Sequence, residues 1–289
     1  MKTIGIVANP GKPGALKLGA ELADWLAAKG VRVLVEHESA PLLEREHLSA
    51  SEEEISRTDM LIVLGGDGTI LRTARMVGAR GTPILGVHFG QYGFITEIHP
   101  PDALAAMERI LHGDFNISER LMLSAKLVRQ GKDIGSYTAL NDIVVSKGPL
   151  ARMLSLKTFV CEKHIATYSA DGIIVATPTG STAYSLSAGG PVINPTVDVL
   201  LITPICPHTL NARSLVIPGS GSVQIVAECN REESTMMLTV DGQTGVPLMC
   251  SDKVDVSRAK YPARIIVWDE WSFYDKLHSR LRWGERFSE

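Results

Sequence analysis

The hydrophobic positions of this chain follow two different rhythms, and the first one alternates strands with helices. Short apolar runs predict four buried strands, at residues 3–8, 31–35, 60–64 and 83–87. Between the first two strands, Leu16, Leu22 and Leu26 recur at helical spacing until Gly30, and residues 101–112 carry a second helical stripe. Strands that alternate with helices in this way predict a parallel, doubly wound sheet.

From about Asn116 onward the pattern becomes that of a mainly β structure. Apolar runs separated by turn pairs predict strands at residues 122–128, 139–146, 154–161, 173–176, 200–203, 222–228, 236–240 and 264–268. Residues 271–283 return to helical spacing, which predicts a helix that packs back on the first domain. We therefore predict α/β plus mainly β: a Rossmann-like α/β domain at residues 1–117 together with 270–289, and a β-rich, β-sandwich-like domain at residues 118–269.

Composition narrows the classes of protein that remain. The chain has 289 residues, 45% of them hydrophobic, which suffices for one large or two modest domains. A formal net charge of −3 gives no general attraction to nucleic acid, and no apolar run is long enough to cross a bilayer. The first residues read as a strand rather than as a signal peptide, so we expect a cytoplasmic protein.

Cysteine and histidine spacing gives no support for a protein-only metal site. The four cysteines, Cys161, Cys206, Cys229 and Cys250, are far apart without a Cys-x-x-Cys pair, and no His-x-x-x-His pair occurs. We expect no metal ligands from the protein, and cysteines that are reduced and mostly buried.

Residues 60–71 combine a strand, a glycine turn and the start of a helix. The apolar run ends in the sequence Gly-Gly-Asp-Gly-Thr at residues 65–69, after which helical spacing resumes. Such a turn lets backbone N–H groups approach phosphate oxygens, and it holds one carboxylate, Asp67, where a substrate would lie. A hairpin turn is the alternative because Asp-Gly is common there, but residues 70–77 do not alternate as a second strand would.

Two polar segments in the β-rich part have a similar character. At residues 169–191 a strand ends in small residues, and a short helix at 183–188 would start with donors that suit phosphate or ribose oxygens. At residues 139–145 the pair Asn141 and Asp142 interrupts an apolar run, and these side chains can bind a purine edge or ribose hydroxyls. An ordinary helix cap and an Asx turn are the alternative interpretations.

The remaining segments are weaker, and several familiar motifs are absent. Residues 86–94 and 241–243 are interpreted as turns when each is taken alone, and the acidic run at 51–54 as the solvated start of a helix. The sequence lacks a P-loop, a Gly-x-Gly-x-x-Gly after the first strand and a Gly-x-Ser-x-Gly elbow. These absences disfavour P-loop kinases, standard dinucleotide dehydrogenases and serine hydrolases.

Taken together, these segments resemble the NAD kinase family. The matching residues follow the family's order over most of the chain: Gly65–Thr69, Asn141-Asp142, Asp171-Gly172, Thr179–Ser187, Pro207-His208 and Asp241-Gly242-Gln243. The first element is shared with diacylglycerol, sphingosine and, more distantly, 6-phosphofructokinases, whereas Thr-Pro-Thr-Gly-Ser-Thr-Ala-Tyr at residues 177–184 is typical of NAD kinases. The resemblance implies an α/β domain followed by a β-rich domain, with NAD near their junction. It also implies transfer of the γ-phosphoryl group of ATP to the 2′-hydroxyl of the adenosine ribose of NAD.

The resemblance further implies roles for individual residues. Asp67 would accept the proton of the 2′-hydroxyl, Gly65, Gly66 and Gly68 would admit the phosphates, and Phe94 would line the adenosine pocket. The other implied substrate contacts are Arg72, Asn141, Asp142, Arg152, Asp171, Thr182, Ala183, Tyr184, Ser185, Leu186, Ser187 and Gln243. Mg²⁺ would accompany ATP, and a homo-oligomer, a dimer or tetramer, would complete the site.

The chain departs from the family pattern at three places. Ser169 stands where many relatives have a basic residue near a ligand phosphate, and Asp142 replaces the Glu of some members. His88-Phe89-Gly90 stands where an Asn or His followed by a small residue is usual. The first departure leaves open which charge meets that phosphate.

Two other functions remain open at this stage. A lipid or small-alcohol kinase would share residues 65–69 without needing residues 169–191. A non-catalytic dinucleotide sensor would use the same pocket without transfer, which the presence of Asp67 disfavours. The sequence leaves open whether ATP or polyphosphate is the phosphoryl donor, and whether NADH is accepted as well as NAD.

Overall fold

The computed structural model describes residues 1–90, 93–96, 98–148, 153–209, 211–228, 236–268 and 273–281. The chain divides into two compact units, Met1–Glu119 with Ala263–Glu289, and Arg120–Pro262. Among the described residues, no helix has both the length and the apolar character of a membrane span.

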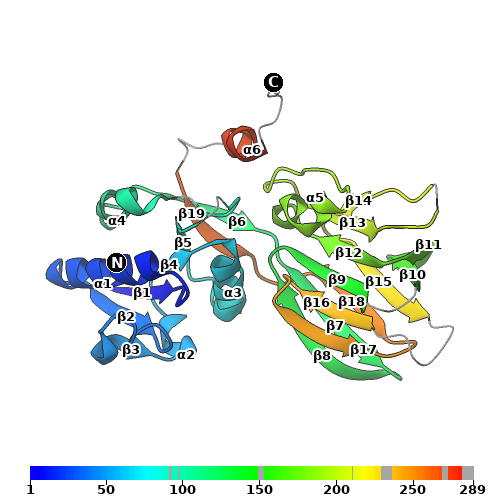
Figure 1. The fold of residues 1–289 in the computed structure, drawn as a ribbon, viewed down its shortest axis with the longest axis horizontal. Coiled ribbons are helices and arrows are strands. Elements are labelled where there is room, and N and C mark those ends of the chain that lie inside the picture. The colour runs from blue at the N-terminus through cyan, green and yellow to red at the C-terminus, as the bar shows by residue number, and fades with distance from the viewer. Residues whose placement is uncertain are drawn as a thin grey trace. The chain divides into compact units, whose positions relative to one another are not determined.

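A seven-stranded sheet forms the centre of the first unit, which is α/β as predicted (Figure 1). Its strands are β1 (Thr3–Ala8), β2 (Arg32–Glu36), β3 (Ser49–Ala50), β4 (Met60–Gly65), β5 (Ile84–His88), β6 (Asn116–Arg120) and β19 (Ala263–Val267). The helices are α1 (Pro13–Ala28), α2 (Glu52–Ile55), α3 (Asp67–Val77), α4 (Ala103–Leu111) and α6 (Phe273–Leu281). Single 3₁₀ turns are η1 (Glu46–Leu48), η2 (Gly78–Arg80) and η3 (Pro100–Asp102).

The order of the strands in this sheet, β3-β2-β1-β4-β5-β19-β6, places a switch point between β1 and β4. The two strands are parallel, with Ala8 opposite Leu64. The Asn9 N–H donates to the Leu64 carbonyl at 2.9 Å, which keeps the ends of both strands together. Ligands of open α/β sheets bind outside the carboxyl ends of the strands at such a point, so the glycine turn at residues 65–69 lies where a ligand is expected.

Burial explains why these strands have continuous rather than alternating apolar runs. Every residue of β4 is buried, because both faces of a parallel sheet are covered. On one face, Ile6 and Ile62 share a core cluster with Leu22 of α1 and Met107 of α4. This apolar layer fixes the strand from which the glycine turn emerges.

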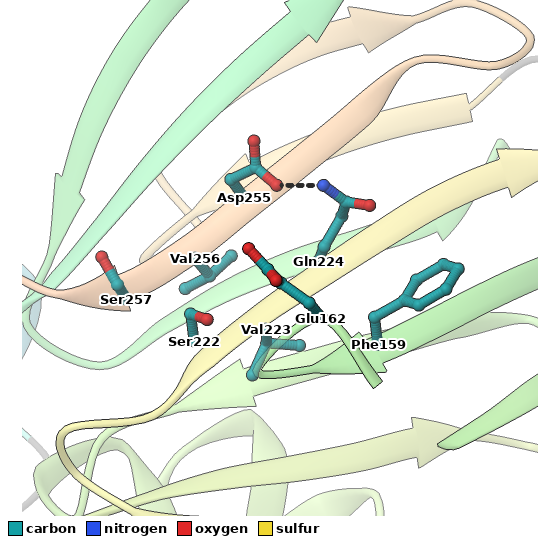
Figure 2. A pocket seen from close by; sticks show the side chains of 8 residues that line it. All are labelled: Phe159, Glu162, Ser222, Val223, Gln224, Asp255, Val256 and Ser257. Atoms are coloured by element: carbon teal, nitrogen blue, oxygen red, sulfur yellow. Dashed lines mark hydrogen bonds between the residues drawn. The ribbon is translucent and has the colours of Figure 1, made fainter. Parts of the chain in front are cut away.

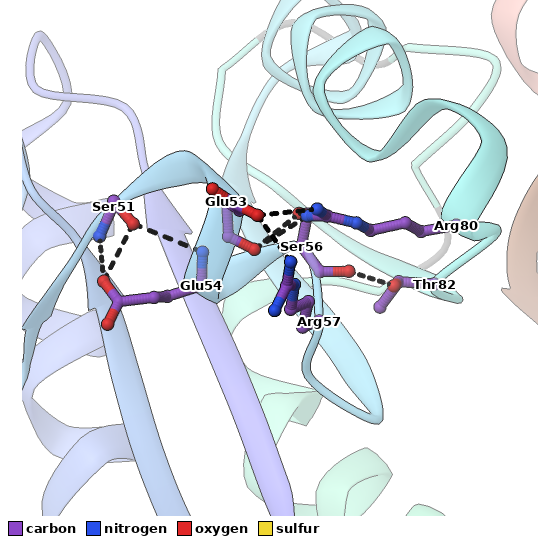
Figure 3. Close-up of polar contacts among 7 residues, drawn as sticks. All are labelled: Ser51, Glu53, Glu54, Ser56, Arg57, Arg80 and Thr82. Carbon is purple, nitrogen blue, oxygen red and sulfur yellow. Dashed lines mark hydrogen bonds and ion pairs between the residues drawn. The ribbon is translucent and has the colours of Figure 1, made fainter.

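The acidic run at residues 51–54 is a helix start, as predicted. Ser51 Oγ accepts the Glu54 N–H at 3.3 Å, and the Glu54 carboxylate accepts the Ser51 N–H at 2.9 Å, which together form a capping box (Figure 3). Arg80 contacts the Glu53 carbonyl and the Ser56 hydroxyl, so this corner is a local polar network. Its carboxylates are engaged in holding α2 in place.

The second unit contains two antiparallel sheets of six strands each. The first has the order β11-β10-β15-β18-β7-β8 and the second β14-β13-β12-β9-β16-β17. The strands are β7 (Leu123–Arg129), β8 (Lys132–Ala139), β9 (Asp142–Lys147), β10 (Leu154–Val160), β11 (Lys163–Ala170), β12 (Gly172–Ala176), β13 (Val199–Ile205), β14 (Leu215–Pro218), β15 (Ser222–Glu228), β16 (Met236–Val240), β17 (Thr244–Leu248) and β18 (Lys253–Arg258). One core cluster takes residues from both sheets, for example Ile143 and Ile173 from one and Leu156 and Ile225 from the other. The unit is therefore a β-sandwich.

The other face of the second sheet carries the segment that follows β12. Val144, Ile174 and Leu201 form an apolar patch there, against which Ala188 and Ile193 pack. The short elements η4 (Thr179–Thr182) and α5 (Tyr184–Ser187) lie in this segment, where the sequence predicts a helix at residues 183–188. The patch explains why a polar, glycine-containing stretch has a defined position.

Three expectations need correction. The strand predicted at residues 264–268 is β19, which pairs with β5 in the first unit rather than with the β-rich unit, because its apolar run fits the buried α/β sheet. The strand predicted at residues 139–146 starts only at Asp142. The cysteines predicted as reduced and mostly buried differ as well: Cys161 and Cys206 are free but exposed, and Cys250 is exposed and disulfide-bonded.

Candidate functional site

Asp67, the carboxylate predicted from the glycine turn, is the first residue of α3 and is partly exposed. β4 ends at Gly65, whose carbonyl accepts the Phe89 N–H at 2.8 Å, and Gly66 is the extended residue that precedes the helix. A carboxylate in the first turn of a helix is favoured by the partial positive charge at that end. The fold therefore holds the Asp67 carboxylate at the carboxyl edge of the sheet, beside the exposed Gly68.

Three successive backbone N–H groups bind this carboxylate. Phe94 N–H donates to Oδ2 at 2.6 Å, and the N–H groups of Ile95 and Thr96 donate to Oδ1 at 3.2 and 3.3 Å. We call residues 94–96 the amide segment. Gly93, which precedes it, allows this approach, because a Cβ there would lie 1.9 Å from Asp67 Oδ1.

The arrangement leaves Asp67 with accepting capacity at one oxygen. A carboxylate offers about four lone-pair sites, two on each oxygen. Among the described residues, Oδ1 accepts two hydrogen bonds and Oδ2 accepts one. Oδ2 is therefore the atom that can accept a further hydrogen bond or a proton.

Arg72, predicted as a substrate contact, is engaged by a buried carboxylate. Its guanidinium forms a bidentate pair with Glu36 of β2, at 2.5 and 2.7 Å, and Glu36 is only 3% exposed. The hydrogen bonds that Arg72 donates to Glu36 raise the pKa of Arg72 above its ordinary value. This pair fixes α3 against β2, a role that the sequence analysis did not anticipate.

In the β-rich unit, the predicted pair Asn141 and Asp142 lies in a turn held by a third residue, Asp241. The Asp241 carboxylate accepts the N–H groups of Leu140, Asn141 and Asp142 at 3.2, 2.8 and 3.2 Å. The Asp241 N–H in turn donates to the Asp142 carbonyl at 3.0 Å. We call residues 140–142 the Asn-Asp turn.

Burial of two acids in this turn changes their electrostatics. Asp142 is 4% exposed and Asp241 8% exposed. Burial, together with the negative charge of Asp241, raises the pKa of Asp142 to about 7. The Asp142 carboxyl group therefore gains or loses its proton near neutral pH.

Two buried polar atoms beside this turn have no hydrogen-bond partner among the described residues: Asn141 Oδ1 and Thr179 Oγ1. Their segments touch closely, since a Cβ on Gly180 would lie 2.1 Å from the Asn141 carbonyl oxygen. The Thr177 hydroxyl donates to the Leu140 carbonyl at 2.6 Å, which ties the two segments together. Unsatisfied buried groups cost about 1–3 kcal/mol each, so a polar partner at this corner would stabilise it.

The predicted contacts at residues 182–187 divide by exposure. Tyr184 and Ser187 are exposed, and Thr182, Ala183 and Leu186 are partly exposed. Ser185 is buried, and its hydroxyl bonds to the Thr203 hydroxyl at 2.9 Å. Ser185 thus attaches α5 to β13, whereas its neighbours present their side chains to the surface.

Asp171 has a cationic partner that the sequence analysis missed. Lys147 Nζ, at the end of β9, lies 2.8 Å from Asp171 Oδ1, and both side chains are roughly one-third exposed. Ser169, which replaces the usual basic residue, lies two positions before Asp171, and its hydroxyl is 4.0 Å from Met153 Sδ. The antiparallel pairing of Ser146 with Gly172 could have indicated Lys147, had the register been known.

The remaining predicted residues contribute less. Gln243 is exposed in the turn between β16 and β17, where its N–H donates to the Val240 carbonyl at 2.9 Å. Arg152 lies outside the described residues. Among the residues that the structure does describe, no group of three or more His, Cys, Asp or Glu side chains is placed to hold a metal ion.

A cavity of about 420 Å³ lies elsewhere on the β-rich unit (Figure 2). It is lined by residues of β10, β15 and β18 and of the turn after β10: Phe159, Glu162, Ser222, Val223, Gln224, Asp255, Val256 and Ser257. Gln224 Nε2 donates to Asp255 Oδ1 at 2.7 Å between the paired strands β15 and β18. The predicted site residues are not part of this lining, so the candidate site residues are assigned within each unit by itself: Asp67 with the amide segment in the first, and the Asn-Asp turn with Asp241 in the second.

Comparison with known proteins finds one family model for each of the two units. The model of the ATP-NAD kinase N-terminal domain matches residues 4–115, and that of the ATP-NAD kinase C-terminal domain matches residues 140–268. A protein named NAD kinase from Heliobacterium modesticaldum is 43% identical over 284 residues, which cover 98% of this chain and 100% of the relative. The NAD kinase of Symbiobacterium thermophilum is 46% identical over 282 residues, 97% of this chain and 99% of the relative.

Two solved structures share the fold. The crystal structure of yeast NADH kinase complexed with NADH has a TM-score of 0.89 and 27% sequence identity, and the match covers 100% of this chain and 90% of that chain. An NAD kinase from Archaeoglobus fulgidus, solved in complex with ATP, has a TM-score of 0.77 at 23% identity, covering 98% of this chain and 99% of that chain. The second likeness concerns the fold alone.

Proposed function

The chain belongs to the NAD kinase family, and on this premise we propose that it transfers the γ-phosphoryl group of ATP to the 2′-hydroxyl of the adenosine ribose of NAD. The products are NADP and ADP. The observation that carries the proposal is Asp67, an acid at the switch point of the sheet whose Oδ2 accepts one hydrogen bond, from Phe94, among the described residues.

The chemistry needs a proton acceptor and an aligned nucleophile. The 2′-oxygen attacks the γ-phosphorus, the bond between that phosphorus and the bridging oxygen of ADP breaks, and the hydroxyl proton passes to Asp67 Oδ2. General-base assistance of this kind contributes about 10²–10⁴-fold to a rate. Positioning and neutralisation of the phosphoryl charge supply most of the rest.

The β-rich unit would supply the dinucleotide contacts. Asn141 Oδ1 and Thr179 Oγ1 are buried acceptors without a partner among the described residues, and the Asp142 carboxyl group lies in the same turn. Ribose hydroxyls or an exocyclic amine would satisfy them. With Asp67 as the catalytic proton acceptor, the full set of proposed substrate contacts is Gly65, Gly66, Gly68, Arg72, Phe94, Asn141, Asp142, Arg152, Asp171, Thr182, Ala183, Tyr184, Ser185, Leu186, Ser187 and Gln243.

Lys147 is proposed as the charge that meets a ligand phosphate in place of the basic residue missing at position 169. Its pair with Asp171 at 2.8 Å fixes the ammonium group while leaving it partly exposed, so it keeps donors for an anion.

Other parts of the proposal concern the reaction's setting. Mg²⁺ would enter as the Mg·ATP substrate, because Mg²⁺ retains several waters and binds mainly through phosphates. A homo-oligomer, dimer or tetramer, and a cytoplasmic location follow from the family resemblance and the sequence rather than from contacts of this chain. The predicted division at residues 117/118 into an α/β and a β-rich domain is proposed as the functional division as well.

The direct test is NADP formation by the purified chain. NAD and Mg·ATP should give NADP and ADP in equal amounts, with the new phosphate on the 2′-oxygen as read by ³¹P NMR. A chain that binds NAD but forms no NADP with ATP or polyphosphate would be a sensor, and phosphorylation of a lipid or small alcohol in preference to NAD would identify the wider superfamily's activity. Parallel assays with NADH determine the acceptor range.

A further inference from the structure

The C-terminal helix α6 reaches the segment that binds Asp67. The guanidinium carbon of Arg280 lies 5.3 Å from the centre of the Phe94 ring, and Arg280 Nη2 donates to the Thr96 carbonyl at 3.4 Å. Arginine over an aromatic face is an attractive contact, and the hydrogen bond adds direction to it. One side chain therefore contacts both ends of the amide segment.

The same two residues donate their N–H groups to Asp67. Phe94 N–H binds Oδ2 at 2.6 Å, and Thr96 N–H binds Oδ1 at 3.3 Å. Arg280 uses the ring of the first and the carbonyl of the second, so it leaves both N–H groups to the carboxylate. The amide segment thus lies between the acid and the arginine.

Phe94 depends on this contact more than its neighbours do. Ile95 and Thr96 are 4% and 2% exposed, and the Thr96 hydroxyl also lies 3.3 Å from His88 Nδ1. Phe94 is only partly buried, follows Gly93, and lies outside any helix or strand. A glycine next to an irregular segment permits many backbone conformations, so a side-chain anchor is needed to select one.

We propose that Arg280 is a positioning residue for Asp67: through Phe94 and Thr96, α6 holds the amide segment that aims Oδ2 at the ribose hydroxyl. The inference rests on the proposed function for its kinetic consequence and on the contacts above for its structural one. Loss of Arg280 leaves Asp67 in place but lets the Phe94 N–H leave Oδ2, and misplacement of a catalytic group by about 1 Å can reduce a rate about 10²-fold.

The test compares Arg280→Ala and Arg280→Lys with Arg109→Ala as matched control. Arg109 also lies 5.3 Å from an aromatic ring, that of Trp268, in the same unit, but it pairs with Asp114 rather than with the amide segment. We expect kcat to fall about 10- to 100-fold in Arg280→Ala with KM for NAD and ATP within threefold. Arg280→Lys, which keeps a cation over the ring, should recover most of the loss, and Arg109→Ala should leave kcat unchanged.

Two further measurements keep the inference separate from the proposed function. In an Asp67→Asn background, Arg280→Ala should lower kcat little further, because the carboxylate that Arg280 positions has already been replaced. Hydrogen exchange of the amides of residues 94–96 should accelerate at least tenfold in Arg280→Ala and not in Arg109→Ala, whether or not the chain makes NADP. Unchanged exchange, an unchanged kcat, or an equal kcat loss in the Asp67→Asn background would each overturn the positioning role. If the wild-type chain makes no NADP, the proposed function fails. The exchange experiment still shows whether Arg280 holds residues 94–96 in place.

Discussion

Asp67 and Asp241 have the same backbone hydrogen-bond pattern but lie in different surroundings. Each carboxylate accepts the N–H groups of three successive residues, 94–96 for Asp67 and 140–142 for Asp241. Asp67 is partly exposed at the start of a helix, whereas Asp241 is 8% exposed and has a second buried acid, Asp142, beside it. The backbone geometry alone does not distinguish a reacting acid from a structural one.

The surroundings make that distinction. Asp67 faces an exposed glycine turn at the carboxyl edge of a parallel sheet, where a substrate can reach Oδ2. Asp241 holds the Asn-Asp turn, and the buried atoms that lack a partner among the described residues are Asn141 Oδ1 of that turn and Thr179 Oγ1. We infer that Asp67, held by the amide segment, serves phosphoryl transfer, whereas Asp241, which holds the Asn-Asp turn, serves binding of NAD.

The largest expected effect is that of Asp67→Asn. The amide keeps the size of the side chain and one oxygen that accepts N–H groups, although its NH₂ would face at least one backbone N–H of residues 94–96, as in Asp241→Asn. Unlike the carboxylate, it cannot take the hydroxyl proton. We expect kcat to fall by about 10²-fold or more, with the dissociation constant of NAD within a few fold. Steady-state kinetics and calorimetric titration with NAD measure both quantities, and an unchanged kcat removes Asp67 from the role of proton acceptor.

Asp241→Asn should act on binding instead. Its amide NH₂ would face one of the three backbone N–H groups, and an unsatisfied buried donor costs about 1–3 kcal/mol. The Asn-Asp turn then loses its position, and we expect KM and the dissociation constant for NAD to rise about tenfold while kcat at saturation stays within threefold.

A matched control for this variant is Asp252→Asn. Asp252 is 1% exposed and pairs with Arg129 at 2.7 Å in the same unit, away from the Asn-Asp turn. It should lower stability without changing KM for NAD. A loss of kcat in Asp241→Asn equal to that in Asp67→Asn would contradict the division.

The buried Asp142 of the Asn-Asp turn should make the free energy of unfolding depend on pH. Its pKa rises from 3.8 in the unfolded chain to about 7 in the fold, because burial disfavours the charged form. The folded state therefore binds more protons between these values, and stability falls as pH rises through the window. Between pH 6 and pH 7 the free energy of unfolding should fall by about 1 kcal/mol from this group alone.

The comparison with Asp142→Asn isolates this contribution. Asparagine carries no charge to bury, so the variant should lose this part of the pH dependence and gain stability relative to wild type as pH rises from 6 to 8. Urea unfolding at several pH values in the absence of NAD measures the difference. A wild-type profile that matches the variant over this range shows that Asp142 titrates elsewhere.

The smallest expected effect is that of Lys147→Gln, which tests the anion contact of the β-rich unit. The ion pair with Asp171 is about one-third exposed, so solvent and salt screen it. We expect KM for NAD to rise about threefold at low salt and less at high salt, as for a partly screened charge. Lys126→Gln is the control, because Lys126 pairs with Asp133 at the same distance of 2.8 Å and carries no predicted role. Equal effects of the two substitutions would remove Lys147 from the site.

The sequence predicted the buried parts of the fold well and its sheet edges poorly. The fully apolar runs of β1, β4 and β12 were visible because both of their faces are covered. The four edge strands of the sandwich, β8, β11, β14 and β17, were all missed, and so was the interior strand β18. β8 carries mostly polar residues, which give no apolar alternation. β14 is apolar but only four residues long, which is too short for a clear pattern.

Among the candidate site residues, those within short sequence motifs could be predicted, whereas those brought together by strand pairing could not. Asp67, Asn141 and Asp142 could be predicted because the residues around each form a short motif. Asp241 lies about a hundred positions from the turn that it clamps, and only strand pairing between β9 and β16 brings it there. The amide segment and Lys147 act through backbone N–H groups and strand register, which leave no residue pattern.

The measurement that tests the division most directly is a single turnover at saturating NAD. Wild type, Asp67→Asn and Asp241→Asn, each fully loaded with NAD, are mixed with Mg·ATP, and NADP is quantified against time. We predict that Asp241→Asn transfers the phosphoryl group at no less than about one-third of the wild-type rate, whereas Asp67→Asn is slower by about 10²-fold or more. Equal rates in wild type and Asp67→Asn, or equal losses in the two variants, would contradict it.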